Sequence, residues 1–154
     1  MHNSKIKKKI ITLIGPTACN KTSTAVHLIK KFPISIIGVD SVQIYKRFNI
    51  GSAKPPKEIL EKYKHHLVDS ADPENIFSVK DFYDQAYRIV IQAHSNNRIP
   101  LLVGGTMMYF NALFKGINDI PEGNEAIREE LQRELDNRGV DKLFNELKEI
   151  DPES

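Results

Sequence analysis

The chain has 154 residues, of which 40% are hydrophobic, so it can bury one packed core but is short for two. Its formal net charge of +2 permits a polyanionic partner without indicating one. Cys19 is the single cysteine, which excludes an intrachain disulfide and a cysteine-based zinc cluster and favours a cytoplasmic location. The apolar run 10–14 is too short for a signal sequence, and no stretch approaches the roughly 20 apolar residues of a membrane span. We therefore expect no membrane association.

The first part of the chain alternates strand and helix patterns. Residues 9–14, KIITLI, form a short β-branched run, and residues 21–32 place apolar side chains at helical spacing. Residues 34–40, ISIIGVD, are a second candidate for a buried strand. Together these segments predict a βαβ unit.

The middle of the chain is loop-like before helical periodicity returns. Residues 47–75 are typical of loops, apart from a short helix candidate at 57–64. Residues 78–97 follow with an apolar stripe at helical spacing, and Ser78 and Asp81 form a capping-box pair at the start. This segment therefore predicts a long helix that begins at a defined residue.

The remaining segments complete an α/β pattern. Residues 98–106, RIPLLVGGT, predict a third strand ending in a glycine turn, and 107–116 predict a helix. Alternation of this kind predicts a parallel sheet flanked by helices, as in P-loop NTPases. From residue 121 the sequence is highly charged and predicts two amphipathic helices broken at 137–139. We therefore divide the chain into an α/β core, 1–120, and a charged helical segment, 121–154.

Residues 15–22, GPTACNKT, have the spacing of the phosphate-binding loop G-x-x-x-x-G-K-[ST], with Asn20 in place of the second glycine. In such a loop, backbone N–H groups surround the anion, Lys21 adds a positive charge, and the Thr22 hydroxyl can bind Mg²⁺. If Asn20 must adopt a positive φ, asparagine is among the best-tolerated non-glycine residues. The alternative is an ordinary strand–turn–helix in which Lys21 and Thr22 are solvated.

Two polar residues follow the predicted second and third strands. Asp40 and Thr106 would face the same crevice as the phosphate loop, since ligands of open α/β sheets bind outside the carboxyl ends of the strands. Equally, Asp40 could cap the turn that it begins. Adjacent His65 and His66 point in different directions and favour a loop or packing role over metal binding. Two further histidines, His27 and His94, lie in helix patterns and are expected to be structural.

Six motifs, taken in chain order, resemble those of the tRNA dimethylallyltransferase, or adenosine isopentenyltransferase, family. They are GPTACNKT, DSVQIYK, GSAKP, HHLVD, FSVKDF and VGGTMMY. Family members are about twice as long, so the chain resembles an N-terminal half and an incomplete copy of the family fold. On this resemblance, residues 121–154 would begin a helical tRNA-binding insertion.

The resemblance implies a transferase of tRNA modification within the ATP- and nucleotide-binding P-loop class. Such enzymes move a dimethylallyl group from dimethylallyl diphosphate to N6 of the adenine adjacent to the tRNA anticodon, with Mg²⁺ as cofactor. Asp40 would be the general base and Thr106 a donor to the leaving group's bridging oxygen. The chain would act as a monomer on tRNA.

The implied diphosphate-binding residues are Gly15, Pro16, Thr17, Ala18, Cys19, Asn20, Lys21 and Thr22, with Thr22 also a metal ligand. The implied tRNA-binding residues are Asp40, Ser41, Val42, Gln43, Thr106 and Arg128.

Two other interpretations remain open at this point. A P-loop kinase of a nucleoside or small metabolite would share the loop but should carry an arginine-rich lid, and residues 120–135 contain five acidic residues against two arginines. A catalytically dead fragment that keeps the fold is the second alternative. The asparagine in the phosphate loop and the short chain support it.

Overall fold

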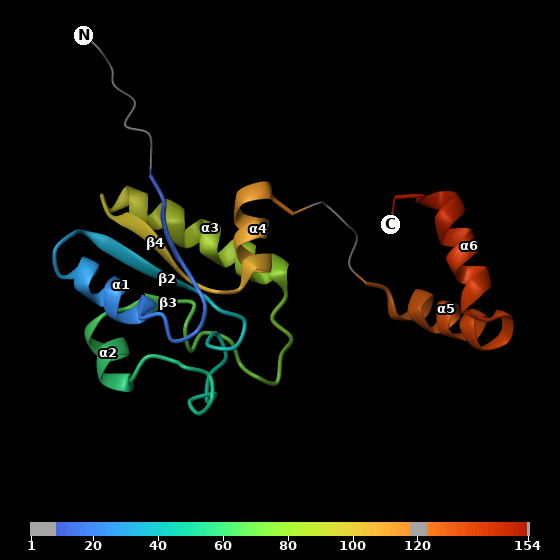
Figure 1. The fold of residues 1–154 in the computed structure, drawn as a ribbon, viewed down its shortest axis with the longest axis horizontal. Coiled ribbons are helices and arrows are strands. Elements are labelled where there is room, and N and C mark those ends of the chain that lie inside the picture. Colours follow the sequence, from blue (N-terminus) through green and yellow to red (C-terminus); the bar gives the residue numbers. More distant parts are fainter. Residues whose placement is uncertain (1–8, 118–122, 154) are drawn as a thin grey trace, which may run out of the picture. The chain divides into compact units, whose positions relative to one another are not determined.

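The computed structural model describes residues 9–117 and 123–153 of the chain. The chain divides into two compact units, Met1–Ile117 and Asn118–Ser154. The described part of the first is an α/β unit, and that of the second consists of helices (Figure 1). Assignment of the second unit to tRNA binding stays a prediction.

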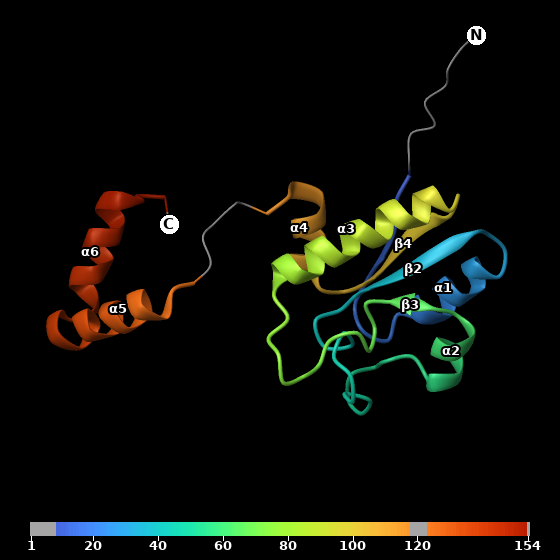
Figure 2. The ribbon, with the colours of Figure 1, turned by 180° about the vertical axis from the view of Figure 1, so that it is seen from behind.

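The α/β unit is built on a sheet whose neighbouring strands are all parallel, in the order β1-β4-β2-β3 over the described residues (Figures 1 and 2). Gly104 of β4 is opposite both Ile14 of β1 and Val39 of β2. Three strands therefore end at the same level, and the segments that follow them leave the sheet side by side. The strands are β1 Ile11–Ile14, β2 Ile34–Val39, β3 His65–His66 and β4 Ile99–Gly104.

Helices cover both faces of this sheet. On one face, Ala25 of α1 packs with Ile34 and Ile36 of β2. On the other, α3 and α4 pack on Ile37 and Val39 of β2, and the rings of Phe82 and Tyr109 stack with centroids 4.1 Å apart. All six residues of β2 are buried, as expected for a central strand covered on both faces. The helices are α1 Lys21–Ile29, α2 Lys57–Lys62, α3 Val79–Ser95 and α4 Met107–Lys115.

The second unit contains α5, Glu125–Arg138, and α6, Val140–Ile150. Gly139 separates them with a φ of 78°, a value that favours glycine. Arg138 also ties the helices together, because its guanidinium contacts Glu146 of α6 at 2.6 Å as well as Glu134 of its own helix at 3.2 Å. The predicted break at 137–139 is therefore confirmed.

The predicted α/β class with a parallel sheet flanked by helices is confirmed, and so is the capping box of α3. The Ser78 hydroxyl accepts a hydrogen bond from the backbone N–H of Asp81 at 3.1 Å, and the Asp81 carboxylate accepts one from the Ser78 N–H at 2.8 Å. Sequence analysis missed β3, where His65 and His66 pair with Ile36 and Ile37. A two-residue strand is too short to leave a periodic pattern.

Both histidines of β3 are partly buried, and their pKa values are lowered from 6.5, chiefly because burial disfavours the charged ring. For His66, the charges of Lys64, Arg98 and His65 lower the pKa further. The unfolded chain thus binds protons more readily than the folded one when the pH falls below 6.5. Folding stability should therefore decrease as the pH drops through that value.

We predict that the free energy of unfolding, measured by urea titration, is lower at about pH 5.5 than at about pH 7.5. A variant carrying His65→Gln and His66→Gln should lose part of this difference, because two titrating groups are removed. An unchanged pH dependence in the double variant would show that other groups cause it.

Candidate functional site

The segment from Gly15 to Asn20 forms a compact loop between β1 and the first residue of α1. The Lys21 ammonium lies over this loop and donates to the carbonyl oxygens of Gly15 and Pro16, at 2.7 and 2.5 Å. The side chain is thereby held beside the start of α1, where backbone N–H groups lack partners within the helix. The arrangement places a cation and a helix N-terminus together, as a phosphate site requires.

Two non-glycine residues of the loop adopt left-handed backbone conformations. Ala18 has a φ of 66°, and Asn20, which precedes α1, has a φ of 61° and a ψ of 24°. The Asn20 carbonyl accepts the first helical hydrogen bond from the N–H of Thr24 at 3.0 Å. The substitution of the motif's second glycine therefore falls on a position that requires positive φ, which asparagine tolerates better than most residues.

Close packing fixes the loop against the end of β4. A Cβ atom at Gly15 would lie 2.7 Å from the Cys19 sulfur, and one at Gly105 would lie 3.2 Å from the Gly15 carbonyl oxygen. At Gly104 a Cβ would be only 2.0 Å from the Val39 carbonyl oxygen. A side chain at Gly104 would push the ends of β2 and β4 apart, and one at Gly105 would press on the phosphate loop.

Asp40 follows β2 directly and uses one carboxylate oxygen to hold its own turn. Oδ1 accepts hydrogen bonds from the N–H groups of Val42 and Gln43, at 2.9 and 3.1 Å. Among the described residues, no hydrogen-bond donor contacts Oδ2. The capping role considered from the sequence is present, and it leaves the second oxygen available for chemistry.

Thr106 links the end of β4 to the residue after Asp40. Its hydroxyl oxygen accepts a hydrogen bond from the N–H of Ser41 at 3.1 Å, and the hydroxyl donates to the Ser41 oxygen at 3.4 Å. The N–H groups of Gly105 and Thr106 both donate to the Val39 carbonyl, each at 3.2 Å. Thr106 is thus held beside the turn that carries Asp40.

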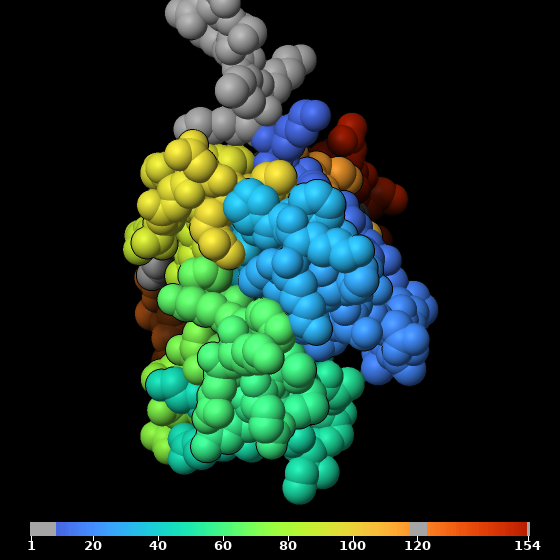
Figure 3. Space-filling model, turned by 90° about the vertical axis from the view of Figure 1, so that its left-hand side faces the viewer, coloured from blue at the N-terminus to red at the C-terminus, as the bar shows by residue number. Residues whose placement is uncertain are grey.

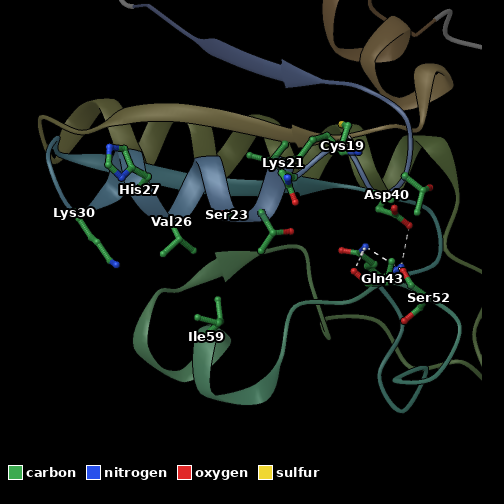
Figure 4. A pocket seen from close by; sticks show the side chains of 17 residues that line it. Cys19, Lys21, Ser23, Val26, His27, Lys30, Asp40, Gln43, Ser52 and Ile59 are labelled. Carbon is green, nitrogen blue, oxygen red and sulfur yellow. Dashed lines mark hydrogen bonds between the residues drawn. The ribbon is translucent and has the colours of Figure 1, made fainter.

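A cavity of about 560 Å³ opens between the phosphate loop, α1, the Asp40 turn and α2 (Figure 4). It brings together most, but not all, of the residues predicted from the sequence. The predicted residues that line it are Thr17, Ala18, Cys19, Asn20, Lys21, Thr22, Asp40 and Gln43. Those that do not line it are Gly15, Pro16, Ser41, Val42 and Thr106. Arg128 lies on α5 in the second unit, so the structure does not test its predicted contact with tRNA.

Sequence analysis missed one wall of the cavity. Figure 4 shows Val26 of α1 and Lys30, the residue that follows this helix, on this wall, with Ile59 of α2 opposite. His27, expected to be structural, is exposed and also lines the cavity, so that expectation was wrong. A sequence pattern could have indicated this wall, because four residues after the phosphate loop have the i, i+3, i+4, i+7 spacing of one helix face. They are Ser23, Val26, His27 and Lys30.

Polar contacts organise the segment between β2 and α3 around the cavity. The Gln43 amide donates to the carbonyls of Ser52 and Ala53, each at 3.1 Å. The Lys54 side chain is only 3% exposed, and its ammonium contacts the Asp69 carboxylate at 2.6 Å. The motifs DSVQIYK, GSAKP and HHLVD, separate in sequence, are therefore joined in one packed loop structure.

The donors present in the cavity fit a magnesium ion that arrives with a phosphate. Mg²⁺ prefers oxygen ligands and is commonly held by one or two protein groups together with substrate phosphates and water. Thr22 and Asp40 both line the cavity and offer such oxygens. No group of three or more histidine, cysteine or acidic residues that could hold a metal alone is found among the described residues.

The described helices include none long and apolar enough to cross a bilayer. A strand, a phosphate-type loop and a helix on a parallel sheet, with an acidic residue at the next strand end, define a P-loop α/β protein.

Comparison with known proteins assigns the family. The sequence model of the IPP transferase family matches residues 43–154, so the chain belongs to this family. The tRNA dimethylallyltransferase of Dichelobacter nodosus is 44% identical over 144 residues, which cover 94% of this chain and 45% of that protein. That of Vesicomyosocius okutanii is 43% identical over 97% of this chain and 49% of its own length. The chain thus spans about half the length of the curated relatives that it matches.

Solved structures agree with this assignment. The full-length tRNA isopentenylpyrophosphate transferase of Bacillus halodurans has 39% identity and a TM-score of 0.70, over 96% of this chain and 49% of that one. A eukaryotic dimethylallyltransferase described as acting on tRNA has 28% identity and a TM-score of 0.79, over 94% of this chain and 36% of that one. The family resemblance stated from the sequence is confirmed.

Because Asn20 already occupies a left-handed conformation, we predict that Asn20→Gly changes the free energy of unfolding by less than about 1 kcal/mol. Asn20→Val should lower it by about 1–2 kcal/mol, since a β-branched residue is strained at positive φ. Urea denaturation of both variants provides the measurement. Equal stability of the valine and glycine variants would contradict the observed backbone geometry.

Proposed function

We propose that this chain binds dimethylallyl diphosphate and presents it to N6 of the adenine adjacent to a tRNA anticodon, as a tRNA dimethylallyltransferase. One observation carries the proposal: the phosphate loop and the carboxylate of Asp40 line the same cavity, and Oδ2 of that carboxylate has no donor among the described residues. Family membership favours this reaction over that of a small-molecule kinase.

The diphosphate would lie at the start of α1. The loop N–H groups and the Lys21 ammonium, already beside them, would stabilise its negative charge. Thr22 would hold Mg²⁺, which when bound neutralises the charge on the departing diphosphate.

In the transfer step, N6 of the adenine attacks the first carbon of the dimethylallyl group, and the bond from that carbon to the diphosphate oxygen breaks. Oδ2 of Asp40 accepts the proton that N6 loses, while Oδ1 continues to hold the turn through Val42 and Gln43. Thr106 would donate to the bridging oxygen by releasing Ser41, whose oxygen lies at the long distance of 3.4 Å. The electron pair of the broken bond leaves with the diphosphate.

The adenine must leave its stack to reach this site, since N6 is otherwise enclosed by neighbouring bases. Gln43 lines the cavity, and exposed Ser41 and Val42 lie beside it on the same turn. We propose that these residues contact the adenine or its neighbours, and that Arg128 of α5 contacts tRNA.

We predict that the chain binds dimethylallyl diphosphate more tightly than ATP in calorimetric titrations at equal Mg²⁺. Lys21→Met should weaken this binding about tenfold or more, because a charge-assisted contact with the diphosphate is lost. Lys57→Met, at an exposed α2 position outside the cavity, is the matched control. Tighter ATP binding would favour the kinase, and binding of neither ligand would favour a dead fragment.

We predict that Asp40→Asn lowers prenyl transfer to an anticodon stem-loop RNA by about 10²–10⁴-fold while leaving stability and diphosphate binding nearly unchanged. Asparagine keeps an oxygen that can accept from the Val42 and Gln43 N–H groups but cannot take up the proton. Asp40→Ala should lose both activity and stability, because the turn also loses its cap. The assay uses the 154-residue chain with radiolabelled donor.

Asp84→Asn, on α3 and away from the cavity, is the control for loss of one carboxylate. Transfer by Asp40→Asn at the wild-type rate would rule out the general-base role. If the unmodified chain binds the diphosphate but transfers nothing, the binding role stands and the catalytic role of this chain alone is refuted.

A further inference from the structure

A second concavity, of about 350 Å³, lies at the other end of the sheet, where β2 and β4 begin. It is enclosed by the segment from α2 to β3, the start of β2 and the turn from α3 to β4. Figure 3 faces this end of the molecule, where the green, light blue and yellow segments meet. The first cavity and this concavity have no lining residue in common.

The second concavity is lined by positive charge without a compensating carboxylate. Lys62, Lys64, His66 and Arg98 line it, and its lining includes no aspartate or glutamate. Within the described part of the chain, none of these four side chains forms an ion pair. Lys64 and Arg98 also lie close enough to His66 for their charges to disfavour its protonated form. Cations gathered in this way repel one another, and an anion would relieve the repulsion.

Arg98 is held firmly at the base of this cluster. Its Nε donates to the Ser35 hydroxyl at 3.0 Å, and one of its terminal nitrogens donates to the Ile34 carbonyl. A guanidinium has five N–H donors, so these contacts orient the group while leaving other donors for a ligand. Such a fixed, planar donor suits the oxygens of a phosphate.

The other side chains around the cluster add neutral hydrogen-bond donors and apolar walls that limit the size of a ligand. Gln92 and Asn96, near the end of α3, bring amide groups to the lining, and the Tyr63 ring lies beneath the Lys62 ammonium at 5.7 Å. Ile29 and Ile89 close the apolar side. The result is a small basic concavity with directed donors.

We propose that this concavity binds a phosphate group through Lys62, Lys64, His66 and Arg98, at a site independent of the phosphate loop and of the function proposed above. The phosphate can belong to a nucleic-acid backbone or to a small phosphate compound, since both present the same oxygens. These four residues define the basic concavity.

The test is NMR titration of the chain carrying Lys21→Ala, a substitution that weakens phosphate binding at the phosphate loop. Inorganic phosphate is the first probe and an anticodon stem-loop RNA is the second. We expect saturable shifts of the backbone amides at residues 62–66 and 96–98. Lys64→Met with His66→Gln in the same background should weaken this binding about tenfold or more, since the Lys64 cation and the His66 ring donor are both lost.

Lys57→Met, on α2 but outside the basic concavity, is the matched control and should leave the titration unchanged. If the double variant does not fold, as judged from its spectrum, Lys62→Met with Lys64→Met replaces it. Shifts caused by the RNA and lost in the double variant identify a backbone phosphate as the ligand. Shifts caused by inorganic phosphate alone identify a small phosphate compound. No shifts with either probe, or shifts that persist in the double variant, would overturn the proposal.

Discussion

The register of the parallel sheet is the constraint on which the candidate site depends. Because Ile14, Gly104 and Val39 are aligned across three neighbouring strands, the phosphate loop, the Thr106 segment and Asp40 begin at one level. A one-residue slip would turn the buried side chains of β2 to the wrong faces, so the packing of α1 and α3 fixes the register as well. Gly104 permits the close approach, since any side chain there would collide with the Val39 carbonyl. The chemistry at the strand ends is therefore set by packing far from the ligand.

The phosphate loop shows how a departure from a motif can preserve its geometry. Motif glycines matter where the backbone must adopt a positive φ, and the structure has that conformation at Asn20. The conformation leaves the Asn20 carbonyl in place to start α1. Ala18 also has a left-handed backbone conformation, so the loop already accepts side chains at positions where glycine would be less strained. The substitution alone is therefore weak evidence for a dead site.

Sequence reasoning succeeded where a local pattern determined the result. The Ser78 and Asp81 capping box, the buried run of β2 and the break at Gly139 depend on neighbouring residues, and each is found in the structure. It failed where distant segments meet. Nothing near Lys54 in the sequence indicates that it pairs with Asp69, and β3 exists only because β2 offers an edge. The site was predictable in its phosphate loop and acidic residue, which are local motifs. Its second wall, formed by α1 and α2, depended on tertiary packing.

The helix termini give an independent argument for an anion at the carboxyl end of the sheet. Four of the described helices, α2, α3, α5 and α6, carry an acidic residue in the first turn, which offsets the partial positive charge there. The exceptions, α1 and α4, have none. These two begin directly after the phosphate loop and after Thr106, at the strand ends that the register aligns. An acidic side chain at either position would compete with a diphosphate for the same N–H groups and repel it. The charge pattern of the helices and the geometry of the loop thus favour the same ligand, although they arise from different residues.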